Sequence, residues 1–251
     1  MFYKVRDIVR AEGVSGLAGR SVAFAYRRGV RPCLPSKPVR YAGIPICHDR
    51  KWGDPLVPIT WAQEVIPDEP GYEAALIAGL VETVSSGDFV IIVGAGLGVT
   101  AVVAALNVGP SGTVHCFEAS KQYVRFAQQT AARNKVTNIS VQHAVVAKPI
   151  FVYGSGNDLG AVMPSSQLPQ CNVLQLDCEG AEVEILRELI IQPRVILVET
   201  HGVYGAPTHL VASLLEKRGY VVSDRGVPNP SKAEHYTKCD VRVLLGEIRR
   251  Q

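Results

Sequence analysis

The stretch Phe89-Val-Ile-Ile-Val-Gly94-Ala-Gly96-Leu-Gly98-Val-Thr-Ala101 decides the fold class of this chain. Its first five residues are apolar and mostly β-branched, which predicts a short buried strand. The apolar run that follows Gly98 has the length of a buried helix. Between the two, the glycines permit unusual backbone dihedrals and let a ligand come close to the main chain. The stretch therefore predicts a strand, a glycine turn and a helix.

From residue 70 onward, the spacing of apolar residues alternates between the periods of strands and helices. We expect helices at 72–85, 99–108, 121–134, 181–191 and 208–218, and strands at 89–93, 113–118, 139–146, 173–177, 194–199, 220–223 and 240–245. In the helix at 181–191, Val183, Leu186 and Ile190 are predicted to face inward. This order predicts an α/β domain with right-handed crossovers and a doubly wound, mostly parallel sheet.

Residues 89–114 carry no charge and are long enough to be mistaken for a membrane span. The run is interrupted by Gly94, Gly96, Gly98, Gly109, Pro110 and Gly112. A buried strand, a turn and a buried helix explain it better, so we expect no transmembrane segment.

The spacing between the glycine turn and the next acidic strand end is typical of a nucleoside-binding site. The strand after Gly98 ends 20 residues later at Glu118, where a carboxylate can accept both hydrogen bonds of a ribose diol. Dinucleotide sites favour G-x-G-x-x-G/A, whose third small residue would stand at position 99. Here that position is Val99 and the third glycine is Gly98, so the spacing is G-x-G-x-G. That form is usual in methyltransferases that bind S-adenosylmethionine. An NAD(P)-dependent oxidoreductase and a non-catalytic cofactor-binding scaffold are the alternatives.

Further polar residues follow the predicted strands at 173–177 and 194–199. Asp177, Glu179 and His201 are candidate catalytic groups, since each could take a proton from a substrate hydroxyl. An ordinary histidine pKa near ~6.5 suits this work, and His201 is predicted to lie in a flexible polar segment. Together with Glu199, these residues could instead bind Mg²⁺ or another divalent ion. Glu182 is expected to stabilise the start of a helix.

The segment Leu176-Asp-Cys-Glu-Gly-Ala-Glu182 resembles the I-D-V-E-G-x-E signature of FkbM-type methyltransferases. Gly94–Gly98, Phe117-Glu118 and Val198-Glu-Thr-His-Gly202 support the resemblance, which covers roughly residues 70–246. It implies a seven-stranded, Rossmann-like class I methyltransferase sheet with an antiparallel last strand. It also implies O-methylation of a hydroxyl on a sugar or another small metabolite. The family's loop often reads D-x-G-A-N-x-G, so the apolar Val93 and Leu97 remove two polar contacts to the cofactor.

The predicted cofactor contacts lie at the ends of the first four strands, with Glu73 of the preceding helix added as a partner for the methionine amino group. They are Glu73, Gly94, Ala95, Gly96, Leu97, Gly98, Glu118, Ala119, Ser120, Ala144, Val145 and Asp177.

Residues 1–69 are expected to be a basic N-terminal extension of a domain at 70–251, helical at first and then proline-rich and irregular, with short edge strands near 39–47. Residues 1–40 carry nine Lys or Arg against two acidic residues, so weak contact with an anionic surface is expected.

The net charge of +3 and the absence of an N-P-P-Y or D-P-P-Y motif argue against specific nucleic-acid binding. Six cysteines without a Cys-x-x-Cys pair suit the reducing cytoplasm. The expected partner is a small hydroxylated acceptor, and an oligomer is left open.

Overall fold

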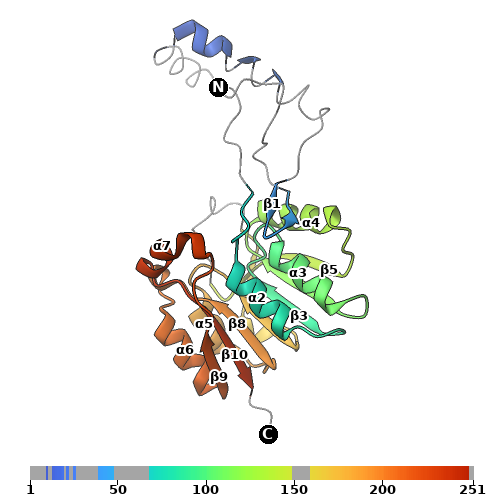
Figure 1. Ribbon diagram of the computed structural model, residues 1–251, viewed down its shortest axis with the longest axis vertical. Coiled ribbons are helices and arrows are strands. Elements are labelled where there is room, and N and C mark those ends of the chain that lie inside the picture. The colour runs from blue at the N-terminus through green and yellow to red at the C-terminus, as the bar shows by residue number, and fades with distance from the viewer. Residues whose placement is uncertain are drawn as a thin grey trace. The chain divides into compact units, whose positions relative to one another are not determined.

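The computed structural model describes residues 10, 13–19, 21–22, 25–26, 39–47, 68–148 and 159–248. The chain divides into two compact units: residues 1–38 with 49–66, and residues 39–48 with 67–251. In the first unit, residues 13–19 are helical. Most of the basic segment and Cys33 lie outside the described residues. The second unit carries the predicted α/β domain (Figure 1).

An eight-stranded sheet forms the centre of the second unit, in the order β6-β5-β4-β3-β7-β8-β10-β9. The strands are β3 (Phe89–Val93), β4 (Thr113–Glu118), β5 (Ile139–Val146), β6 (Ala161–Met163), β7 (Val173–Leu176), β8 (Val195–Glu199), β9 (Tyr220–Asp224) and β10 (Val243–Ile248). The pairs from β6 to β8 are parallel, whereas β10 runs antiparallel to both β8 and β9. The predicted doubly wound, mostly parallel fold is thus confirmed, with one strand more than the seven expected.

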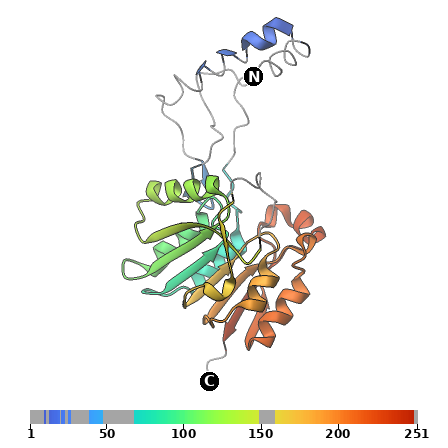
Figure 2. The same ribbon diagram turned by 180° about the vertical axis from the view of Figure 1, so that it is seen from behind.

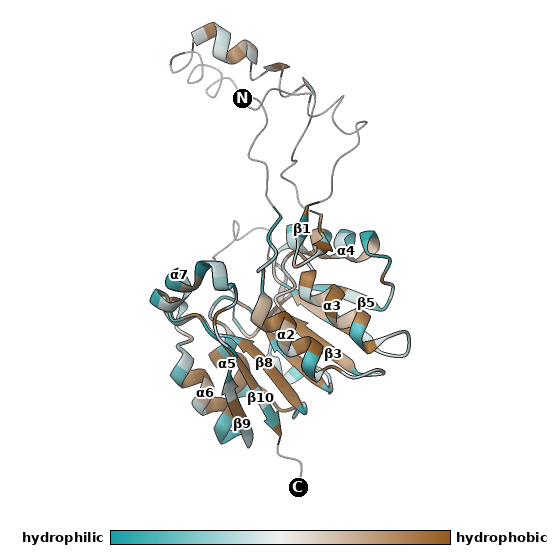
Figure 3. Cartoon of the chain, in the orientation of Figure 1, coloured by the Kyte–Doolittle hydropathy of each residue, from teal (hydrophilic) through white to brown (hydrophobic). Residues whose placement is uncertain are grey.

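Helices cover both faces of this sheet because the buried strand residues alternate between two cores. Val90 and Ile92 of β3 pack with α2 (Ala74–Thr83), α3 (Val99–Val108) and α4 (Lys121–Arg133). The residues between and after them, Ile91 and Val93, pack with α5 (Glu182–Glu188) and α6 (Thr208–Lys217) on the other face, which the view from behind shows (Figure 2). The central strands are apolar along their length (Figure 3), as a sheet covered on both sides requires.

The charge-free stretch at 89–114 forms β3, the glycine turn, α3 and the start of β4, as predicted. Within the described part of the chain, no helix combines the length and the apolar character that crossing a bilayer requires.

Two elements predicted in the C-terminal part of the chain, the helix at 181–191 and the strand at 240–245, differ from the structure. Helix α5 ends at Glu188, and the chain then runs extended, so Leu189 and Ile191 are buried while Ile190 is 74% exposed. The expected inward position of Ile190 is therefore wrong. In an extended segment successive side chains point to opposite sides, so the burial of Leu189 and Ile191 leaves Ile190 exposed. The last strand begins at Val243 rather than Asp240, after an unpredicted short helix, α7 (Ala233–Lys238).

Part of the predicted N-terminal extension packs within the second unit. β1 (Arg40–Tyr41) and β2 (Ile44–Pro45) form a small antiparallel ribbon of their own rather than an edge of the large sheet. The amide of Cys47 donates to Thr130 Oγ1 of α4 over 3.0 Å, and Asn134 donates to the carbonyl of Pro45. These bonds fasten the ribbon to the end of α4.

The order of the strands reverses between β3 and β7, because the chain adds β4, β5 and β6 on one side of β3 and then β7 and β8 on the other. Open α/β sheets bind ligands beyond the carboxyl ends of their strands at such a reversal. The residues that follow β3 and β7 therefore have the position of a ligand site.

Candidate functional site

A cavity of about 390 Å³ opens at the reversal of strand order. Its wall is built by residues that follow four neighbouring strands, with Gly94 after β3, Glu118 at the end of β4, Asp177 after β7 and Glu199 at the end of β8. Such a volume lies at the lower end of the usual range for small-molecule sites, roughly 300–1,000 Å³.

The glycine turn fits tightly against the rest of the sheet on one side and is open on the other. A Cβ added to Gly94 would lie 1.7 Å from the carbonyl oxygen of Asp177, and one added to Gly98 would lie 2.8 Å from Ala127 Cα of α4. No atom of the described residues lies within 4 Å of a Cβ built on Gly96, whose φ is +50°. Gly96 lines the cavity, so the open side of the turn faces the space where a ligand would lie.

Glu118 is held in place by the main chain on either side of it. Oε2 accepts the amide of Gly96 over 2.9 Å, and Oε1 accepts the amide of Ser120 over 2.8 Å. Burial raises the pKa of this carboxyl, and the backbone hydrogen bonds oppose the increase. Each carboxylate oxygen has a second lone pair, so Glu118 can still accept hydrogen bonds from a ligand in the cavity.

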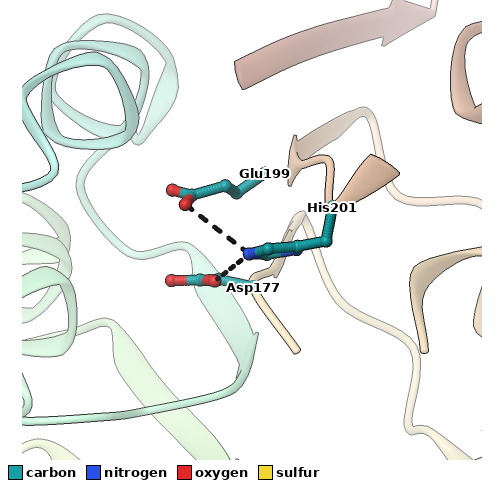
Figure 4. A group of neighbouring side chains, drawn as sticks. All are labelled: Asp177, Glu199 and His201. Atoms are coloured by element: carbon teal, nitrogen blue, oxygen red, sulfur yellow. Dashed lines mark ion pairs between the residues drawn. The ribbon is translucent and has the colours of Figure 1, made fainter. Parts of the chain in front are cut away.

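Three carboxylates surround one edge of the His201 imidazole. Nε2 lies 3.7 Å from Asp177 Oδ1, 3.7 Å from Glu179 Oε2 and 3.7 Å from Glu199 Oε1. Figure 4 shows the ring directed toward the carboxylates of Asp177 and Glu199. Burial raises the pKa of Asp177 to about 7, against the effect of His201, and raises the pKa of Glu199 well above its usual value. Among the described residues, Asp177, Glu199 and His201 form the group that could hold a metal ion.

The other ring nitrogen of His201 contacts a carboxylate that the sequence assigned to helix stabilisation alone. His201 Nδ1 lies 2.9 Å from Glu182 Oε1, which also accepts the amide of Cys178. Glu182 is fully buried and His201 is 4% exposed. The prediction of His201 in a flexible polar segment is therefore wrong, because the chain after β8 continues into the interior and pairs with Ala206.

The expected ordinary pKa of His201 is wrong for the same reason. Burial alone would lower it, but the hydrogen bond to Glu182 and the charges of Glu182, Asp177 and Glu179 raise the pKa to about 9. At neutral pH and without another cation, the ring is protonated and has no lone pair with which to act as a base. Asp177 and Glu179 remain the candidate bases at this site.

Glu73 also lines the cavity, just before α2, and its backbone is in the left-handed region with a φ of 45°. Glu179 also has a positive φ, of 54°. Left-handed conformations of residues other than glycine cost about 1–3 kcal/mol, and they often occur at ligand sites. Burial and the charge of Asp177 raise the pKa of Glu73 to about 8, although the hydroxyl of Tyr72 lowers it.

Most of the predicted site residues line the cavity, and three do not. Those that line it are Glu73, Gly94, Gly96, Leu97, Glu118, Ala119, Ser120, Ala144, Val145, Asp177 and Glu179. His201 lies behind Glu199 and Asp177, while Ala95 and Gly98 belong to the turn without lining the cavity. The roles assigned to these residues stay predictions.

Sequence reasoning missed several parts of the wall, among them Tyr123, Lys148 and Leu159 and a section that follows β9. Asn229, Lys232 and Tyr236 come from the segment between β9 and β10, and Glu69 pairs with Lys232 beside the cavity. This segment has no apolar periodicity. The sequence feature that could have indicated this part of the site is Lys232 close to Pro230, but a basic side chain near a proline is common on protein surfaces.

No protein-family model matches this sequence, and no curated protein matches it. Several solved structures resemble the fold. A precorrin-6y C5,15-methyltransferase from Geobacter metallireducens is 16% identical, with a TM-score of 0.48 over 74% of this chain and 90% of the other. A SAM-dependent O-methyltransferase from Thermotoga maritima is 13% identical, with a TM-score of 0.47 over 75% of this chain and 68% of the other.

A fibrillarin from Aeropyrum pernix, solved with natively bound S-adenosyl-L-methionine, is 14% identical and has a TM-score of 0.44 over 68% of this chain and 75% of the other. The likeness of these proteins to this chain is one of fold. The function of this chain must therefore be argued from its own cavity.

Proposed function

We propose that this chain is an S-adenosylmethionine-dependent methyltransferase that O-methylates a hydroxyl on a sugar or another small metabolite. The observation that carries the proposal is the shared cavity of Gly96, Glu118 and Asp177 at the reversal of strand order. The Leu176–Glu182 segment, with its resemblance to the FkbM signature, supports the finer assignment to that family.

The cavity suits a nucleoside better than a dinucleotide. Dinucleotide sites place the pyrophosphate at the start of the helix after the glycine turn. Here Val99 and Thr100 at the start of α3 are 1% and 2% exposed, and Gly98 packs against α4. Glu118 and the open side of Gly96 would hold the ribose and the adjoining part of the cofactor. These contacts support S-adenosylmethionine over NAD(P).

When bound, S-adenosylmethionine supplies a methyl group on a sulfonium sulfur, which keeps the bonding electron pair as the methyl passes to the acceptor oxygen. The side chains of this chain have to prepare that oxygen. Asp177 follows β7, which lies between β3 with its glycine turn and β8 with Glu199. There it can orient the acceptor hydroxyl and receive its proton.

The rest of the cavity wall supports a polar acceptor of small size. Asn229, Lys232 and Tyr236 line the same cavity as Asp177 and offer donors and acceptors, which suits a molecule with several hydroxyls. Specific nucleic-acid binding is not part of the proposal.

Calorimetry of the full chain with S-adenosylhomocysteine and, separately, with NAD tests the cofactor. We expect saturable binding of S-adenosylhomocysteine and none of NAD. Tight NAD binding alone would favour an oxidoreductase. A radiolabelled methyl-transfer assay over hydroxylated acceptors, with amines as the comparison, tests the reaction. Cofactor binding without transfer to any acceptor would favour a non-catalytic scaffold.

A further inference from the structure

The distances around His201 have an unusual regularity. Its Nε2 is 3.7 Å from an oxygen of each of Asp177, Glu179 and Glu199. Hydrogen bonds between nitrogen and oxygen are about 2.7–3.2 Å long, so the ring makes none with these three groups. Two ligands of one metal ion, each about 2.0–2.2 Å from it, are commonly 3–4 Å apart. One ligand atom from each of Asp177, Glu199 and His201 lies within 4.8 Å of the others.

Glu182 fixes the ring in the orientation that a metal ligand needs. The fully buried Glu182 binds Nδ1 at 2.9 Å and is itself held by the amide of Cys178. With a hydrogen on Nδ1, the lone pair of a neutral ring lies on Nε2 and is directed at the carboxylates (Figure 4). Metal-binding histidines characteristically donate their second nitrogen to a carboxylate in this way.

A separate observation at Glu199 also indicates a missing cation. Glu199 is 7% exposed, and its Oε2 is buried without a hydrogen-bond partner among the described residues. A buried, unpartnered carboxylate oxygen is costly unless an ion or a donor compensates it. The Glu199 carboxylate extends past the ring to the same side as Asp177 (Figure 4).

We propose that Asp177, Glu199 and His201 bind one divalent metal ion, with Glu179 as a fourth ligand, and that Glu182 is a positioning residue for His201. Carboxylates suit Mg²⁺, Ca²⁺ and Mn²⁺, whereas imidazole suits transition metals. One imidazole among carboxylates therefore favours a transition-metal ion, of which Mn²⁺ shares both preferences. Mg²⁺ fits this mixed set less well.

The ion has a consequence for the reaction, and this step alone rests on the proposed methyltransferase function. A metal at Asp177 and Glu199 borders the cavity, where it can bind the acceptor oxygen. As a Lewis acid it would lower the pKa of that hydroxyl, so the proton leaves to solvent or to a neighbouring carboxylate before the oxygen attacks. The preferred acceptor would then offer two adjacent oxygens to the ion.

Binding of the metal alone tests the site without any assumption about activity. The full chain is stripped with EDTA, freed of chelator and titrated with Mn²⁺, with calorimetry and electron paramagnetic resonance of free Mn²⁺ as readouts. We expect one ion per chain, Mg²⁺ binding at least tenfold weaker, and a higher melting temperature with Mn²⁺.

Three variants locate the ion. Glu199→Gln and Asp177→Asn should weaken Mn²⁺ binding at least tenfold without lowering the melting temperature of the metal-free protein. Glu182→Gln should weaken it roughly 10- to 100-fold, as expected for the carboxylate behind a histidine ligand. His209→Ala, at an exposed position on α6, is the matched control and should bind Mn²⁺ like the wild type.

Absence of Mn²⁺ binding at millimolar concentration, or equal binding by wild type, Glu199→Gln and Asp177→Asn, would overturn the proposal. S-adenosylhomocysteine binding is measured in the same EDTA-treated protein. If the metal fails to bind while this ligand still does, only the metal site is wrong. If neither binds, the proposed cofactor fails as well.

Discussion

The main chains of Gly94 and Asp177 are packed directly against each other. A Cβ on Gly94 would lie 1.7 Å from the carbonyl oxygen of Asp177. Gly94 also has a φ of +91°, which residues with side chains rarely adopt. The two central strands can therefore end side by side only if the first of them is followed by glycine.

Gly94→Ala should lower the free energy of unfolding by about 2–6 kcal/mol, the combined cost of a left-handed alanine and an overpacked contact. Gly96→Ala is the matched control, since its Cβ would contact none of the residues that the structure describes and only the backbone cost of about 1–2 kcal/mol remains. Because Gly96 lines the cavity, its variant should instead lose affinity for S-adenosylhomocysteine. Denaturant unfolding and calorimetry measure the two effects, and equal stabilities of the two variants would contradict this reading of the turn.

Glu118→Ala should weaken S-adenosylhomocysteine binding by ~1.5–3 kcal/mol, because a charged hydrogen-bond partner is lost. The same change frees the amides of Gly96 and Ser120, so some loss of stability is expected too. Glu118→Gln keeps the volume but can accept from only one of these amides through its single amide oxygen. Glu216→Ala, at an exposed position on α6, serves as the control. Wild-type affinity in a folded Glu118→Ala protein would exclude a cofactor role.

Asp177→Asn should reduce turnover by roughly 10²-fold or more, as expected when a general base is lost. The melting temperature should change little, because Asp177 Oδ1 is 3.7 Å from His201 and makes no short hydrogen bond to it. Initial rates of methyl transfer and thermal melting of the same preparation measure both quantities. A much earlier melt would make Asp177 a structural residue, and near-normal turnover would place the centre of the site elsewhere.

Deletion of residues 1–38 should leave S-adenosylhomocysteine affinity intact. The cut is placed before Val39, because the ribbon that follows is bonded to α4. The deleted segment carries eight of the nine basic residues in 1–40. We therefore expect the full chain to bind phosphatidylserine vesicles at low salt, with weaker binding as salt is added, and the shortened chain to bind much less. If the full chain ignores such vesicles at low salt, the basic segment has no such role.

β3, β4 and β5 have the bounds that the sequence predicts. The clearest case is β3, a run of buried and mostly β-branched residues that stops abruptly at Gly94. By contrast, β6 is three residues long and α7 is almost entirely polar, so neither contains enough apolar residues to show a period. Elements of this size depend on tertiary contacts, which the local sequence does not contain.

The same distinction applies to the site. Carboxylates at strand ends could be predicted to converge, since the carboxyl ends of parallel strands share one edge of the sheet. The contact between Glu182 and His201 could not, because an acid in the first turn of a helix has a sufficient local explanation. Their pairing depends on how the chain continues beyond β8, where no pattern indicates that a histidine is buried.

The reversal of strand order also affects how the chain folds during its synthesis. Phe89 and Asn172 hydrogen-bond where β3 and β7 begin, although they are 83 residues apart in the chain. Until β7 has left the ribosome, one edge of β3 therefore has no neighbour, in what becomes the middle of the finished sheet. A nascent chain with an open, apolar strand edge is prone to pair with other chains. The arrangement that creates the cavity thus leaves the growing polypeptide dependent on prompt completion or on a chaperone.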